Sequence, residues 1–282
     1  MKRFFLKASV LCFLLFIAVL TSCSDNEDNS TVNMQSQDQD ISEMILSSDM
    51  DVVTASIEDY MIEIYENQED EEARGVAGSS KLMPECATVT IDAEQNFREL
   101  TIDFSSQGCV IRGHLYRGQI VLTYTRDIDA EEISLSYVLN NFYFDNKQVS
   151  GSNTILKTLS NVNGNPQFTH NVNLTVTWPN GVEATRDGQI VREWVEGFGS
   201  GVFTDNVFEV TGYWASGFVN GNTHNYEIVT PLRREMTCYY FVSGVLSVER
   251  TLFSGELDYG DGNCDNQAAF TFESGTVINI FI

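Results

Sequence analysis

The spacing of apolar residues along the chain changes once, near residue 84. Between residues 41 and 65, apolar residues recur at steps of three and four. This spacing predicts one amphipathic α-helix over 41–66, either continuous or broken at Ser47-Ser48-Asp49. The opposite face of this helix carries four acidic residues: Glu58, Asp59, Glu63 and Glu66. We expect these carboxylates to face solvent while the apolar face docks on the rest of the chain, with a metal site as the alternative.

Residues 84–282 show a period of two instead. Apolar and polar residues alternate in runs such as 119–124 and 172–177. Asn180-Gly181, Asp187-Gly188 and Asn220-Gly221 separate such runs and favour hairpin turns, because both residue types tolerate positive φ. The pattern predicts a mainly β domain over 84–282. We expect an antiparallel meander of about 12–14 strands, folded as a curled sheet, a sandwich or an open barrel, with the C-terminus paired into the last strand.

The segments on either side of the predicted helix have little apolar content. Residues 24–40 are almost entirely polar and acidic, which indicates a disordered tether over 23–40. Residues 67–83 are first acidic and then rich in Gly and Ser, which indicates a linker between the helix and the β domain.

The N-terminus is typical of an export signal. A short basic start precedes the apolar stretch from Ala8 to Val19, which is too short to span a bilayer comfortably and fits the apolar core of a signal peptide over 1–22. The run Leu20-Thr21-Ser22-Cys23 resembles the lipobox of bacterial lipoproteins. The resemblance implies that Cys23 carries the lipid, that cleavage occurs before it, and that the protein is anchored to a membrane through this residue.

Charge narrows the range of partners. Loss of the three basic residues in 1–22 leaves 13 basic against 40 acidic residues, a net charge of −27. This balance excludes a general nucleic-acid binder and leaves membrane attachment to the acyl chains on Cys23. The charge is also uneven, since residues 23–73 contain sixteen acidic residues and no Lys or Arg.

The four remaining cysteines of the exported chain allow three pairings. Ile102-Asp103-Phe104 ends five residues before Cys109, and Leu257-Asp258-Tyr259 ends five residues before Cys264. This internal repeat, with partners 23 and 26 residues upstream, predicts the disulfides Cys86–Cys109 and Cys238–Cys264. A metal site is the rival interpretation, but no Cys-x-x-Cys spacing supports it.

Two short patterns are candidate binding sites. Asp261, Asn263 and Asp265 alternate as calcium ligands do, although Asn266 stands where a calcium loop needs glycine, and a disulfide-pinned turn is the alternative. Among the many aromatic residues, Trp194, Tyr213 and Trp214 are candidates for stacking on a sugar or another apolar ligand. Packing inside the β domain is the ordinary role of such residues.

Catalytic motifs are not evident. Glu193 and Glu196 flank Trp194 as a pair of glycosidase carboxylates would, but three residues apart on a strand they point to opposite faces, so we expect cross-strand ion pairs there. The three histidines lie far apart in sequence, and none of the common hydrolase or nucleotide-binding motifs occurs.

Several features together resemble uncharacterised lipoproteins of Flavobacteria and other Bacteroidetes. They are the lipobox, the acidic run Ser24-Asp25-Asn26-Glu27-Asp28, the strand start Pro84-Glu85-Cys86, and the segments Arg192–Gly197 and Asp258–Asp265. The resemblance implies an outer-membrane location, at the cell surface or otherwise on the periplasmic face, and brings no activity with it. We expect a non-catalytic lipoprotein with a ligand-binding or structural role and no cofactor. The alternatives are a carrier or chaperone for lipid or other hydrophobic cargo, and a hydrolase acting on glycans or esters.

Overall fold

The computed structural model describes residues 27–73, 85–125, 131–250 and 253–281, with the side chains of the helix described from Ser42 onward. One long helix, α1 (Glu27–Ala73), precedes fourteen strands and one short 3₁₀ turn, η1 (Phe203–Asp205). The strands are β1 (Thr88–Ala93), β2 (Phe97–Asp103), β3 (Cys109–Ile111), β4 (His114–Thr125), β5 (Glu132–Phe144), β6 (Lys147–Thr158), β7 (Gln167–Thr177), β8 (Glu183–Glu196), β9 (Val207–Phe218), β10 (Thr223–Glu235), β11 (Phe241–Glu249), β12 (Ser254–Asp261), β13 (Gln267–Phe272) and β14 (Val277–Phe281).

All strands belong to one antiparallel sheet. Each strand pairs with its neighbours in sequence, except that β2 pairs directly with β4 and the short β3 lies off this path, paired with β4. The sheet is not closed, because β1 and β14 lie at opposite ends of the strand order. The predicted meander is therefore confirmed, and of the three predicted architectures it is the curled sheet that forms. Residues 277–281 pair with β13, as expected for the C-terminal strand.

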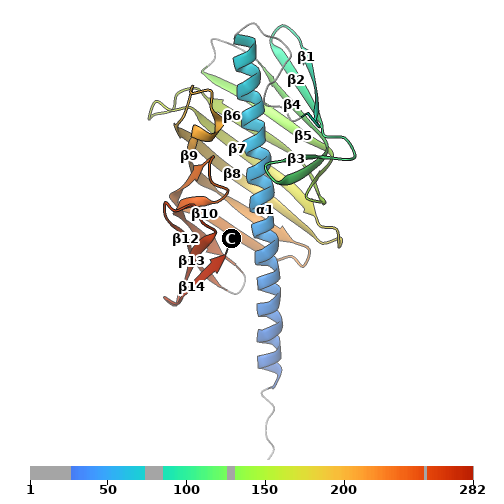
Figure 1. Cartoon of the computed structure of the whole chain (residues 1–282). Coiled ribbons are helices and arrows are strands. Elements are labelled where there is room, and N and C mark those ends of the chain that lie inside the picture. The colour runs from blue at the N-terminus through green and yellow to red at the C-terminus, as the bar shows by residue number, and fades with distance from the viewer. Residues whose placement is uncertain (1–26, 74–84, 126–130, 251–252, 282) are drawn as a thin grey trace, which may run out of the picture.

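The sheet curls around the helix. In Figure 1, α1 lies along the concave face of the sheet, with β1 and β2 at one side and β12–β14 turning back toward the helix at the other. Gly118 in β4 and Gly244 in β11 adopt positive φ angles of 85° and 110°, and both stand where the strand register shifts. Such bulges increase local twist and bend a strand, and glycine is the residue that adopts these angles without strain.

The helix is longer than the pattern of apolar residues predicts. It begins at Glu27 instead of near residue 41, so most of the predicted disordered tether is helical, and it continues to Ala73 through the first part of the predicted linker. It is also unbroken at Ser47, whose hydroxyl accepts a 2.6 Å hydrogen bond from the Tyr226 hydroxyl instead of capping a second helix. At the C-terminal end the extra length has a clear cause, because Glu72 is held by an ion pair with Arg98.

The main core lies between α1 and the concave face of the sheet. The helix contributes an apolar stripe that includes Val53, Ile57, Met61 and Ile64, all 3% exposed or less. Opposite its middle, aromatic side chains from neighbouring strands and the helix form one packed cluster: Tyr60, Phe104, Tyr116, Phe142 and Phe144. The apolar face of the helix therefore docks on the body as predicted.

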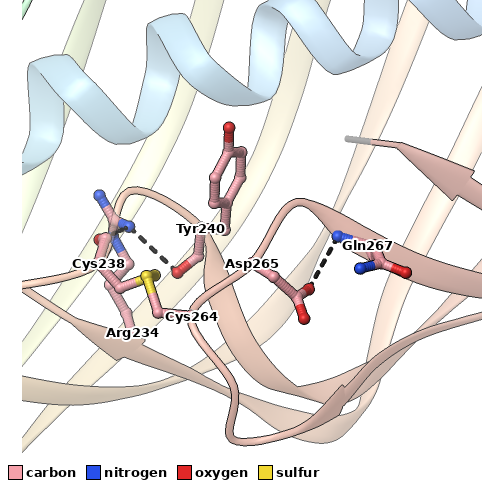
Figure 2. The surroundings of a disulfide bond; sticks show 6 residues. All are labelled: Arg234, Cys238, Tyr240, Cys264, Asp265 and Gln267. Atoms are coloured by element: carbon pink, nitrogen blue, oxygen red, sulfur yellow. Dashed lines mark hydrogen bonds between the residues drawn. A yellow bond between two sulfur atoms is a disulfide. The ribbon is translucent and has the colours of Figure 1, made fainter.

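Both predicted disulfides are present. Cys86 pairs with Cys109 and Cys238 pairs with Cys264, with Cα atoms 5.4 and 5.7 Å apart. The second disulfide joins the loop before β11 to the loop after β12, and Figure 2 shows it beside Arg234 and Tyr240. The sequence repeat is also visible in the packing. Phe104 and Tyr259 each stand five residues before a disulfide-bonded cysteine, and both side chains are buried.

Candidate functional site

The acidic residues of α1 face the sheet, which corrects the expectation that they are exposed. Glu58 and Asp59 are 0% and 4% exposed and lie against Arg192 of β8, which is itself 2% exposed. Arg192 Nη2 lies 2.9 Å from Glu58 Oε2, while Arg192 Nη1 donates a hydrogen bond to Asp59 Oδ1. Arg234 of β10 contacts the other Asp59 oxygen at 3.2 Å. The two carboxylates and two guanidinium groups form a buried charge cluster that holds the middle of the helix.

Further ion pairs continue along the helix in both directions. Toward its C-terminus, Glu66 contacts Lys157 at 2.5 Å and Glu63 contacts Arg112 at 2.5 Å. Toward its N-terminus, Asp51 contacts Arg186 at 2.6 Å, and Glu43 lies 2.8 Å from the buried His224. The acidic helix and the inward-facing basic residues of the strands are thus complementary, which accounts for the separation of charge along the sequence. No ion pair of this cluster is arranged as a metal site: among the described residues no group of three or more His, Cys, Asp or Glu side chains is placed to hold a metal ion.

Burial shifts the protonation of the central cluster. Burial raises the pKa of Glu58 to about 7, against the opposing effect of Arg192. Burial would also raise the pKa of Asp59, but Arg192 and Arg234 together outweigh it and lower that pKa. The pKa of His170, which lies 3.6 Å from Glu58, falls well below its usual value because of burial and the nearby Arg192, so this imidazole is neutral. At neutral pH Asp59 is therefore ionised beside the arginines, whereas Glu58 is partly protonated.

Replacing Glu58 with glutamine should remove a defined part of the pH dependence of stability. A carboxyl whose pKa is raised from 4.5 to about 7 on folding stabilises the fold below pH 4.5, and this contribution is lost as the pH rises through 7. The wild type should therefore lose stability relative to Glu58→Gln across this window, by an amount on the order of 1–3 kcal/mol. Urea unfolding of both proteins at several pH values measures the difference in stability. His170 is present in both proteins, so its own titration contributes to both measurements. A difference that is constant, or that grows in favour of the wild type with rising pH, would contradict this assignment.

A small internal space lies beside this cluster. It has a volume of about 40 Å³ and is lined on the helix side by Thr54 and Glu58 and on the sheet side by Arg186 and Trp214. Its lining includes polar atoms without a protein hydrogen-bond partner, among them Thr54 Oγ1 and Trp214 Nε1. A volume of this size accommodates water, which would satisfy such groups. The charge cluster therefore has a structural explanation that needs no substrate.

A much larger cavity opens where the N-terminal half of the described helix meets the C-terminal strands. Its volume is about 570 Å³, within the range of roughly 300–1,000 Å³ that small-molecule sites occupy. The helix contributes Met44, Ile45, Val52 and Ala55, and strands β11–β14 contribute Leu246, Val248, Leu257, Phe270, Ile280 and Phe281. Ile45 and Phe281 are 62% and 79% exposed, so apolar side chains reach from the cavity to the protein surface. The cavity arises because β12–β14 curl toward the helix without closing on it.

Several polar side chains also line this cavity. They are Ser47, Ser48, Asp49, Asp51 and Ser56 of the helix, and Tyr226, Arg234, Tyr239, Tyr240, Arg250 and Tyr259 of the sheet and its loops. Figure 2 shows Tyr240 directed from the disulfide-linked loop toward the helix, while the Arg234 guanidinium is held by the backbone carbonyl of Cys238 at 2.6 Å. Burial raises the pKa of Tyr226 and that of Tyr259, so both hydroxyls stay neutral, and the Tyr226 proton is donated to Ser47 Oγ. An apolar wall with a few such groups is the usual composition of a small-molecule site.

The three aromatic residues predicted to bind a ligand do not come together. Trp194 and Trp214 are each 7% exposed, the first packed on Phe208 and the second stacked on Tyr226 with ring centroids 5.3 Å apart. Tyr213 is 58% exposed and, as the neighbour of Trp214 in β9, points to the opposite face of the sheet. None of the three lines the large cavity. Local sequence patterns do not identify the residues of this cavity, because its walls come from segments about 200 residues apart.

The candidate calcium loop forms hydrogen bonds within itself. Asn263 Nδ2 donates to Asp261 Oδ1 at 2.8 Å, and the carboxylate of Asp265 accepts the backbone N–H of Gln267 at 3.0 Å, the contact drawn in Figure 2. Cys264, between these residues, is tied to Cys238. The arrangement fits the disulfide-pinned turn that we considered as the alternative.

Hydrolase chemistry receives little support from the described side chains. Glu193 accepts hydrogen bonds from Asn163 and Asn165, whereas Glu196 forms a 2.7 Å ion pair with Arg233, so the two carboxylates have separate partners. His114 lies 2.5 Å from Asp145 and contacts the Tyr239 hydroxyl, which resembles part of a catalytic triad. Burial and the nearby Asp145 raise the pKa of Tyr239, however, which disfavours the phenolate that a nucleophile would require.

Comparison with protein-family models, curated proteins and solved structures gave no match to this chain. In the part of the chain that the structure describes, no helix has the length and apolar character needed to cross a bilayer. The predicted lipidation site, Cys23, lies outside the described residues.

Proposed function

We propose that this chain is a non-catalytic, lipid-anchored protein that binds an apolar small molecule in the cavity between α1 and strands β10–β14. The observation that carries the proposal is a contrast between two parts of the interface between α1 and the sheet. The middle of α1 packs on the sheet through an apolar core and paired charges, whereas its N-terminal half leaves a space of about 570 Å³ with mostly apolar walls. Empty apolar space costs stability, so a cavity of this size indicates that something other than folding maintains it.

This proposal favours ligand binding, or carriage of hydrophobic cargo, over a purely structural role. The exposed apolar side chains of Ile45 and Phe281 at the edge of the cavity suit entry of an apolar molecule, and no convergent set of catalytic groups lines the cavity among the described residues. The lipobox around Cys23 supports attachment to the outer membrane, and the acidic residues that follow support display at the cell surface, with the periplasmic face as the alternative. Protease treatment of intact cells distinguishes these two locations, since only a surface protein is cleaved.

Filling the cavity should abolish binding of an apolar probe. Leu257 lines the cavity from β12, and a tryptophan in its place occupies space that a ligand would need. We expect the full chain to bind N-phenyl-1-naphthylamine saturably with enhanced fluorescence, and Leu257→Trp to weaken this binding at least tenfold. Leu159→Trp, at a 41% exposed position outside the cavity, is the matched control and should bind as the wild type does. No saturable binding by the wild type, or equal binding by Leu257→Trp, would overturn the proposal.

A further inference from the structure

Arg250 is unusual among the basic residues near the helix. It follows β11, lines the large cavity and donates one 3.4 Å hydrogen bond to the Tyr226 hydroxyl. Its Nε and Nη1 atoms are buried and have no hydrogen-bond partner, and no carboxylate of the described residues lies within ion-pair distance. The guanidinium lies over the rings of Tyr226 and Phe253, 5.8 and 5.3 Å from their centroids, which gives cation–π contacts but no hydrogen-bond acceptor. A guanidinium group carries five N–H donors, so most of its hydrogen-bonding capacity is unused, which is costly away from water.

The other basic residues that face the helix differ because each has an acidic partner, although Arg186, Arg192 and Arg234 also keep a buried Nε without a hydrogen-bond partner. Lys157, Arg186 and Arg192 each contact an acidic residue of α1 at 2.9 Å or less. Arg234, which also lines the cavity, is held by Asp59. Arg250 is therefore the cavity-lining cation of the described chain that has no carboxylate within ion-pair distance, and it stands next to an apolar space.

We propose that the cavity binds a long-chain fatty acid, with the carboxylate on Arg250 and the acyl chain along Leu246, Leu257 and Phe270. This inference rests on the proposed function and adds the chemical class of the ligand. A carboxylate is the anion that a guanidinium binds most completely, through two parallel hydrogen bonds. The Tyr226 hydroxyl, 3.4 Å from Arg250 Nη2, lies at the same end of the cavity.

The charge of the surroundings favours a monoanion over a doubly charged phosphate. Asp49 and Asp51 both line the cavity, and Asp51 lies close enough to Arg250 for their charges to interact. Asp51 is already paired with Arg186 at 2.6 Å. One unpaired guanidinium thus balances one negative charge of a ligand, and a second negative charge would be placed near these two aspartates.

Competition between a fatty acid and the matching alcohol tests this assignment. Hexadecanoic acid and hexadecan-1-ol share the acyl chain and differ in the charged group, so both should displace N-phenyl-1-naphthylamine from the full chain, the acid at a concentration at least tenfold lower. In Arg250→Gln the affinity for the acid should fall at least tenfold, while the alcohol and the probe bind as before. Arg250→Lys, which keeps the charge, should retain part of the preference for the acid. Arg233→Gln, at a surface ion pair outside the cavity, should leave all affinities unchanged.

Three results would overturn the inference. The first is equal displacement by acid and alcohol in the wild type, which would leave the apolar cavity intact as a site but remove its preference for an anion. The second is an equal loss of acid, alcohol and probe binding in Arg250→Gln, which would make Arg250 a structural residue. The third is no probe binding by the wild type, which would remove the proposed function together with this inference.

Discussion

Replacing Arg192 with alanine should lower the free energy of unfolding by about 3–5 kcal/mol. The substitution removes the cation shared by Glu58 and Asp59 while both carboxyl groups remain buried, at 0% and 4% exposure. An uncompensated buried charge is expensive, and Arg234, at 3.2 Å, contacts only Asp59. Urea unfolding followed by circular dichroism, with the disulfides intact, measures the loss.

Arg233→Ala is the matched control for this prediction. Arg233 neighbours Arg234 in β10 but pairs with Glu196 and Glu235 at the surface, where an ion pair contributes about 1 kcal/mol or less. Replacement of the buried Arg192 should therefore lower the free energy of unfolding several-fold more than replacement of the surface Arg233. Equal losses in the two variants would mean that the charge cluster under the helix does not hold the structure together.

Replacing Trp194 with alanine should also destabilise the protein by about 3–5 kcal/mol, because it removes a large side chain from a packed region. Trp194 contacts Phe198 and Phe208 with ring centroids 5.1 and 5.3 Å apart, and its indole N–H donates to the backbone carbonyl of Glu196. Denaturant unfolding measures this loss, and binding of the apolar probe should persist under conditions in which the variant is folded.

Tyr213→Ala provides the comparison, since this tyrosine is 58% exposed. Its removal should change stability by about 0.5 kcal/mol or less. If Trp194→Ala instead left stability unchanged and abolished ligand binding, then the sequence-based interpretation of Trp194 as a stacking residue would be correct and the core assignment wrong.

The strands and disulfides were predictable because their determinants are local. Alternation with period two and Asn-Gly turns identify a meander wherever they occur, and the repeat before Cys109 and Cys264 fixed the pairing. Asp187-Gly188 shows the limit of local signals, since it lies inside β8 instead of at a turn. A side chain at Gly188 would clash with the Tyr213 carbonyl and Trp214, so this glycine serves close strand packing.

The charged interface between α1 and the sheet could have been predicted from the positions of basic residues in the strands. Arg186 and Arg192 share strand parity with Ile190 and Trp194, so all four point to the concave face. Inward-pointing arginines, together with a segment that has sixteen acidic residues and no basic ones, indicate a charged helix docked on the sheet. Apolar spacing alone places the carboxylates in solvent and ends the helix at residue 66 instead of Ala73.

Closure of the sheet and the cavity could not be predicted in the same way. Both depend on the summed twist and bulges of fourteen strands, and a small change in curl decides whether β14 pairs with β1, fills the space beside α1 or leaves it open. No local sequence motif identifies Arg250 either. Its proposed role depends on the absence of a neighbouring carboxylate, which only the three-dimensional structure shows.

A crystal of the full chain soaked with a fatty acid that carries bromine at its terminal carbon gives the most direct test of the cavity as a binding site. The anomalous signal locates the bromine without reference to any model of the ligand. We expect one bromine peak inside the cavity, among Leu246, Leu257 and Phe270, with the carboxylate density at Arg250. A bromine peak only on the outer surface, or side chains filling the space between α1 and β12–β14, would contradict it.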